Sequence, residues 1–217
     1  MPHYHLLIRT NLLLLLAAFT AGLRNLRQLD IAARIFLLLI GVTLLEEVLA
    51  YYWAVKFHDN TKILRLYSII EIVLLSLYFN FSIKVFQKYN VGFYVAGISL
   101  LAGIADIVLS HYPVHFGGLF MYFTGTLVII MAITSLFQLV KTSAYLRITV
   151  IPHFWFAVIQ LLFSCCTILI FAFYNYFTKS IAQYQFTISY SLFAVNYLSS
   201  IGFAVIFLLY PKMRAHV

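Results

Sequence analysis

Two glutamates at matching depths in neighbouring apolar runs are the residues of this chain best suited to chemistry. Glu47 lies in one run and Glu71 in the next, and each is twelve positions from Asp59 in the polar turn between them. If the chain folds back at that turn, the two carboxylates face each other, about 13 Å from the ends of their helices at about 1.5 Å per residue. A carboxylate inside a membrane costs about 2.5–3.5 kcal/mol on insertion scales and usually has a function. The pair therefore predicts a ligand, proton or cation site.

Two tyrosines extend this predicted site toward the membrane surface. Tyr51 follows Glu47 by four residues and Tyr67 precedes Glu71 by four, so that each pair shares one helix face. Two facing carboxylates need compensation by a shared proton, a bound cation or a basic side chain. Arg9 is the candidate basic partner, because it is the only arginine expected inside the outer half of a membrane span.

Other titratable residues are expected on the same side of the membrane. Asp106 lies near the outer end of its run and is a third carboxylate for the site. Glu46 is expected to point away from the facing pair, as a support or as the partner of the arginine. His58 and His111 are the candidate metal ligands, but no His-Glu-x-x-His or comparable zinc signature accompanies them. We therefore predict no cofactor, although a bound cation would suit the carboxylates.

A second set of polar residues recurs at helical spacing in the last two apolar runs. Gln160 and Ser164 lie on one face of the sixth run, and Asn196 and Ser200 on one face of the seventh. Hydrogen bonds between membrane helices, worth about 0.6–2 kcal/mol each, would explain them. The alternative is that these faces line a cavity continuous with the glutamate site.

The composition indicates a membrane protein made of helices. Of the 217 residues, 64% are hydrophobic and 9% are charged, whereas a soluble domain carries about 25% charged residues. We expect one transmembrane domain over residues 1–217 and no soluble domain. The net charge of +8 is explained by contacts with anionic membrane lipids, so that nucleic acid need not be invoked as a partner.

Seven apolar runs are long enough to cross a membrane as helices. They cover about residues 6–23, 35–56, 63–84, 91–110, 118–140, 150–176 and 184–209. Short polar connections between them predict an antiparallel seven-transmembrane-helix bundle. The first run is also compatible with a secretory signal peptide, since leucines precede small residues there.

Basic residues predict the orientation of the bundle. One side carries Arg9, Lys56, Lys62, Arg65 and Lys179. The other side carries Arg24, Arg27, Arg34, Lys84, Lys88, Lys141, Arg147, Lys212 and Arg214. Because basic residues accumulate on the cytoplasmic side, we expect the N terminus outside and the C terminus in the cytoplasm, with the bacterial inner membrane as the location.

Short motifs do not assign a family. The eight residues Leu45–Tyr52 resemble the acidic, aromatic-flanked motif of membrane-bound lycopene cyclases, but the proline that usually precedes that motif is absent and there is no second copy. A rhodopsin is excluded because the run Gln183–Leu209 has no lysine that could form a retinal Schiff base.

Three functions are compatible with an outward-facing polar pocket. The first is ligand or cation binding in a sensory or regulatory role, which would need a separate signalling or membrane partner because no output domain follows the last run. The second is a small proton- or cation-coupled transporter. The third is an intramembrane enzyme acting on lipid. We expect binding rather than catalysis.

Overall fold

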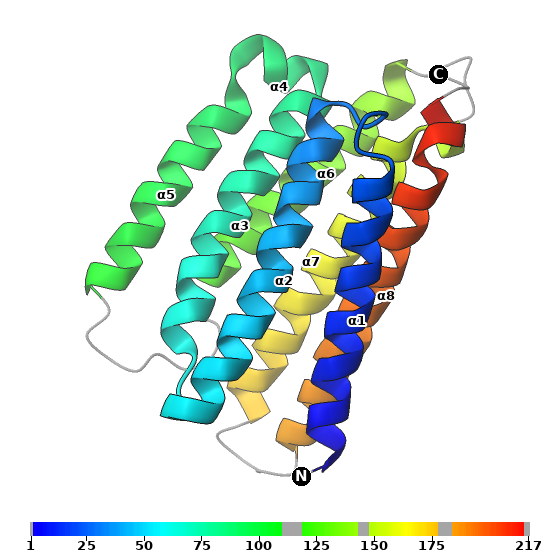
Figure 1. Ribbon diagram of the computed structural model, residues 1–217. Helices are drawn as coiled ribbons and strands as arrows, with labels where there is room; N and C mark the ends of the chain where they lie inside the picture. Colours follow the sequence, from blue (N-terminus) through cyan, green and yellow to red (C-terminus); the bar gives the residue numbers. More distant parts are fainter. Residues whose placement is uncertain (1, 110–118, 143–147, 178–183, 215–217) are drawn as a thin grey trace.

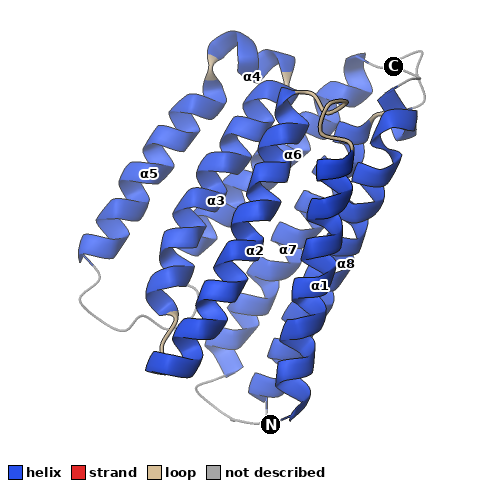
Figure 2. Ribbon diagram, viewed as in Figure 1, coloured by secondary structure: helices blue, strands red, loops and turns tan. Residues whose placement is uncertain are grey.

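Long α-helices dominate the computed structural model, which describes residues 2–109, 119–142, 148–177 and 184–214. The helices are α1 (Pro2–Arg24), α2 (Ile31–Phe57), α3 (Thr61–Ser82), α4 (Lys84–Tyr89), α5 (Val91–Leu109), α6 (Leu119–Thr142), the 3-10 helix η1 (Ile148–Val150), α7 (Pro152–Phe177) and α8 (Tyr184–Arg214). Figure 2 shows no strand among these residues. The all-α prediction is confirmed for this part of the chain.

Six of these helices are long and apolar enough to cross a membrane. The candidate spans are His5–Arg24, Thr61–Ser82, Val91–Val108, Leu119–Lys141, Pro152–Phe173 and Thr187–Arg214. The chain is therefore an integral membrane protein with several spans. The predicted span that is missing from these six is the second, over about residues 35–56, which corresponds to α2, a helix of 27 residues that contains two basic residues and two glutamates. The count of seven spans is not confirmed.

The long helices run side by side as a bundle (Figure 1). α2 packs between α1 and α3, α5 packs against α3, and α8 packs between α7 and α1. The chain begins at one end of the bundle and finishes at the other (Figure 1). We call these the N-terminal end, which also holds the α2–α3 turn, and the C-terminal end, which also holds the α1–α2 loop and α4.

Polar residues at the predicted α2–α3 turn set the limits of both helices. His58 adopts a left-handed conformation and its N–H bonds to the carbonyl of Ala54, which ends α2. Asp59 Oδ1 then accepts hydrogen bonds from the N–H and the hydroxyl of Thr61, at 2.9 and 2.6 Å. This side chain satisfies donors in the first turn of α3. The two helices consequently run antiparallel, as predicted.

Aromatic side chains pack together in the half of the bundle nearer the C-terminal end. Phe36 of α2 contacts Tyr78 of α3, Phe156 of α7 and Phe203 of α8, with ring centroids 5.0, 4.7 and 4.8 Å apart. Phe36, Tyr78 and Phe156 are almost completely buried. We refer to these four residues as the aromatic core.

Candidate functional site

Three glutamates of α2 and α3 gather in the half of the bundle nearer the N-terminal end. Glu46 is buried, with 8% of its surface exposed, whereas Glu47 and Glu71 are partly buried. Glu46 lies within electrostatic range of both other carboxylates. The predicted burial of the Glu47–Glu71 pair is thus not confirmed, and the buried carboxylate is Glu46, which was expected to point away from that pair.

The two adjacent glutamates of α2 have different surroundings. Glu47 Oε1 accepts a hydrogen bond of 2.7 Å from Asn11 Nδ2 of α1, so this carboxylate is directed toward α1 and not solely toward Glu71. Adjacent residues project about 100° apart on a helix. The spacing of residues along the chain therefore could not define the direction in which Glu47 points.

Tyr67 ties α3 to α2 close to the glutamates. Its hydroxyl lies 2.8 Å from Thr43 Oγ1. The single hydroxyl proton of Thr43 is already donated to the carbonyl of Leu39 at 2.9 Å, so Tyr67 donates to Thr43. The proton of Tyr67 is then not free to bind a glutamate.

The other two predicted members near the surface lie apart from this cluster. Tyr51 is exposed, and its hydroxyl is 3.2 Å from His5 Nδ1 of α1. Arg9 is exposed and forms no ion pair with any residue that the structure describes. Neither Glu46 nor Glu47 therefore has the arginine partner that the sequence suggested.

Glu71 lines a small cavity between α3, α6 and α7. The cavity volume is about 60 Å³, which is enough for a few water molecules or a small cation. Its polar lining consists of Glu71, Ser68, Tyr122, Thr124, Gln160, Ser164 and Thr167. The Thr167 hydroxyl is buried and has no hydrogen-bond partner in the described part of the protein. Its bonding capacity is available to a small polar species inside the cavity.

The cavity joins one of the two predicted polar faces to the glutamate site. Gln160 and Ser164 of α7 are buried and share the lining with Glu71. Asn196 and Ser200 of α8 are not among the lining residues; Ser200 is buried and Asn196 is partly buried. The α7 face thus belongs to the cavity, while the α8 face does not line it.

The remaining candidates do not extend the cavity. Asp106 is partly buried on α5 and is not a lining residue. His58 is exposed at the end of α2, and His111 lies outside the described residues. Within the described ranges, no three His, Cys, Asp or Glu side chains lie together in a way that could hold a metal ion.

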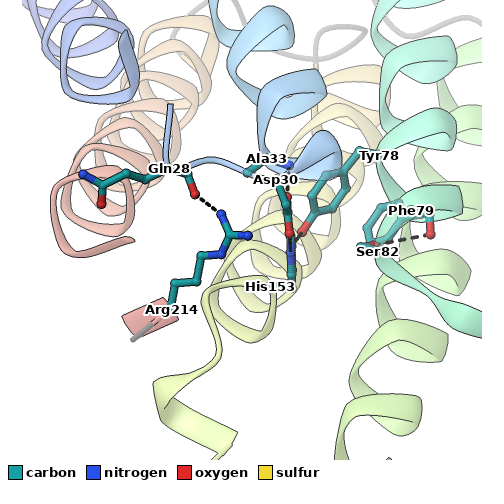
Figure 3. Close-up of polar contacts among 8 residues, drawn as sticks. All are labelled: Gln28, Asp30, Ala33, Tyr78, Phe79, Ser82, His153 and Arg214. Carbon is teal, nitrogen blue, oxygen red and sulfur yellow. Dashed lines mark hydrogen bonds and ion pairs between the residues drawn. The ribbon is translucent and has the colours of Figure 1, made fainter. Parts of the chain in front are cut away.

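A second polar cluster, which the sequence analysis missed, joins three helices at the C-terminal end (Figure 3). Asp30 Oδ2 lies 2.7 Å from His153 Nε2 of α7, and His153 Nδ1 lies 3.3 Å from the hydroxyl of Tyr78 in α3. Asp30 Oδ1 accepts the N–H of Ala33 at 2.8 Å and so caps the first turn of α2. The cap could have been found from Asp30 preceding an apolar run. Its partner His153 is 123 residues away and left no local signal.

The surroundings of Asp30 keep its carboxylate ionised. Burial raises its pKa, but the hydrogen bond and the charge of His153 outweigh burial and, with the N–H of Ala33, lower the pKa to about 2. An ionised Asp30 accepts from Nε2–H of His153, and Nδ1 on the other side of the ring lies against the hydroxyl of Tyr78. Both imidazole nitrogens have partners within the protein, so this cluster connects the helices α2, α3 and α7.

Comparison with protein-family models, curated proteins and solved structures finds no match for this chain.

Proposed function

We propose that this protein is a seven-span membrane protein that binds a proton or a small cation at Glu71, in a regulatory role. The observation that carries the proposal is the position of Glu71 on the polar cavity between α3, α6 and α7. At about 60 Å³ the cavity is far below the roughly 300–1,000 Å³ of sites for larger organic ligands. Its volume favours a proton, water or a single small cation.

The chemistry of the lining supports the same ligand class. The polar groups around Glu71 in the cavity are hydroxyls and the amide of Gln160, and all of these are neutral. Glu47 likewise has a neutral partner in Asn11. Neutral partners leave the negative charge of a carboxylate uncompensated in an apolar bundle, which is costly. A proton or a cation provides the missing positive charge.

The position of α2 supports the proposal that this helix also crosses the membrane and brings the number of spans to seven. α2 packs between α1 and α3 (Figure 1), Glu46 is buried, and Glu47 is bonded to Asn11. Charged residues in membrane helices usually face such protein interfaces instead of lipid. The glutamates are therefore compatible with a spanning helix that is shielded by its neighbours.

Infrared spectroscopy of the carboxyl groups tests the proposal. Wild-type protein, Glu71→Gln and Asp106→Asn are compared in lipid nanodiscs from pH 5 to pH 9, with and without Na⁺ or Ca²⁺. We expect either a protonated carboxyl band or a cation-induced shift of the carboxylate band. The signal should disappear in Glu71→Gln and persist in Asp106→Asn, which removes an acid that does not line the cavity. A Glu71 carboxylate that is ionised over the whole pH range and does not shift with either cation would refute the proposal.

Proton-coupled transport is a second candidate, favoured by the polar face of α7. Thr167, Ser164 and Gln160 line the cavity, and His153 lies on the same helix toward the C-terminal end. The buried Phe36 and Phe156 block this face between the cavity and His153, so transport requires the aromatic core to rearrange. Proton uptake into proteoliposomes, lost in Glu71→Gln and retained in Asp106→Asn, would distinguish transport from binding alone.

A further inference from the structure

An open pocket at the C-terminal end of the bundle gathers three arginines from separate parts of the chain. Its volume is about 460 Å³, and its lining includes Arg27 of the α1–α2 loop, Arg34 of α2 and Arg214 at the end of α8. This volume falls within the roughly 300–1,000 Å³ that is usual for small-molecule sites. We propose that the pocket binds a phosphate group, as carried by the headgroup of an anionic lipid.

The arginines have donors available for such a ligand. Arg27 and Arg34 are exposed, and neither forms an ion pair with a residue in the described ranges. Arg214 donates from Nη1 to the carbonyl of Gln28 (Figure 3). This bond holds one edge of the guanidinium against the α1–α2 loop, while a guanidinium has five N–H donors in all. Arginine binds phosphate well because its planar fork can donate two parallel hydrogen bonds.

The one acid in the lining does not neutralise these arginines. Asp30 lines the pocket, but its oxygens are bonded to His153 at 2.7 Å and to Ala33 at 2.8 Å. Its carboxylate is therefore bonded on the side of α7, and it can balance only one of the three guanidinium groups. The pocket keeps an excess of positive charge from three guanidinium groups.

The backbone adds to the positive potential. Ile31 and Ala32, the first two residues of α2, belong to the lining. The start of a helix carries unpaired N–H groups and the positive end of its dipole, which favour a phosphate. The helix start alone would not define a site, but here it coincides with the arginines and the pocket.

The position of the pocket indicates where the phosphate comes from. It lies where α1 ends, α2 begins and α8 ends, at one end of the bundle of candidate spans (Figure 1). Leu29 and Phe81 contribute apolar surface to the lining. Under the proposed orientation this end faces the cytoplasmic leaflet, which is rich in anionic headgroups. A headgroup with its glycerol carbons matches a lining that is both basic and apolar.

Lipid binding to the full-length protein tests this inference. Detergent-purified wild type is titrated with short-chain phosphatidylglycerol, with phosphatidylcholine of the same chain length, and with inorganic phosphate. Binding is followed by native mass spectrometry and by the melting temperature. We expect one phosphatidylglycerol to bind, with weaker binding of phosphatidylcholine. Tight binding of inorganic phosphate would keep the phosphate site but identify a soluble source of the ligand.

A matched pair of variants separates the pocket from the general basic surface. Arg27→Gln/Arg34→Gln removes two charges from the lining, and Lys84→Gln/Lys141→Gln removes two exposed charges at the same end but outside it. We expect the arginine variant to lose about tenfold or more in affinity, since charge-assisted contacts are lost, and the lysine variant to change less than twofold. Equal losses in both variants, or no binding of either anion to wild type, would overturn the inference. Melting temperatures without ligand verify that both variants fold.

Discussion

The two carboxylate oxygens of Asp30 bind partners from distant parts of the chain. One oxygen caps α2 through the N–H of Ala33, and the other binds His153 of α7. An asparagine could still cap the helix, because Asn and Asp are similarly good at this position, but it could not provide the charge that His153 meets. Substitutions at this residue therefore separate the two interactions.

We predict that Asp30→Asn lowers the stability of the bundle at pH 7 and that Asp30→Ala lowers it further, by about 1 kcal/mol for the lost cap. In the wild type the pKa of Asp30 is about 2, below the value of about 3.9 in an unfolded chain. Its contribution to stability is therefore fully present above about pH 4 and decreases as the pH falls toward 2. Thermal unfolding followed by tryptophan fluorescence between pH 2 and 7 should show this decrease in the wild type. An equally steep acid dependence in Asp30→Asn would contradict the assignment to Asp30.

The spacing of Glu47 and Glu71 along the chain predicted a hairpin that carries both residues, but it did not predict the direction in which each side chain points. The equal distances of Glu47 and Glu71 from Asp59 placed both on the same half of an α2–α3 hairpin, which the structure contains. The direction in which Glu47 points depends on packing of α2 against α1, and no local pattern encodes that contact. For the same reason the Asn11–Glu47 bond and the Asp30–His153 bond could not be predicted from sequence.

At the scale of whole helices, close contact between α3 and the start of α5 requires a glycine. Gly92 is buried near the start of α5, and its N–H donates to Asn80 Oδ1 at 3.0 Å. A β-carbon at this position would collide with the backbone oxygen of Ser76 and with the side chain of Asn80. The collision with backbone can be relieved only by moving α5 away from α3.

We predict that Gly92→Ala destabilises the protein by about 1–3 kcal/mol, the usual cost of overpacking. Gly97→Ala is the matched control on the same helix, because a β-carbon at Gly97 has no neighbouring atom within 4 Å. An alanine also favours helix over glycine, so the control should be neutral or slightly stabilising. Denaturation of both variants in the same detergent measures the difference. Equal stability of the two would mean that α3 and α5 do not pack as described.

The long helices themselves were predictable because each needs only a continuous apolar run. The predicted runs over about 63–84 and 91–110 correspond to α3 and α5, with limits that agree within a few residues. The six residues of α4, by contrast, were expected to be a connection. A helix of that length lacks a sustained apolar pattern, and it is limited here by extended Ile83 and left-handed Asn90.

For the molecule as a whole, the number of spans depends on whether α2 crosses the membrane. The same point determines which residues lie on the same side of the membrane. With seven spans the two ends of α2 lie on opposite sides, and with six spans that exclude α2 they lie on the same side. The chain begins and finishes at opposite ends of the bundle (Figure 1), which is the arrangement expected for an odd number of crossings. The basic residues at the C-terminal end further favour a cytoplasmic location for that end.

We predict that single cysteines at the two flanks of α2 are labelled from opposite sides of the membrane. Gln28 and Lys62 flank the helix and are exposed, so that Gln28→Cys and Lys62→Cys are accessible and well tolerated. In a background with Cys165 and Cys166 replaced by alanine, a membrane-impermeant maleimide should label Lys62→Cys in intact spheroplasts, and Gln28→Cys only after permeabilisation. The unsubstituted background should remain unlabelled. A crossing helix must separate its two flanks, so labelling of both cysteines from the same side would exclude α2 as a span. Labelling in the reverse order would keep seven spans and invert the orientation.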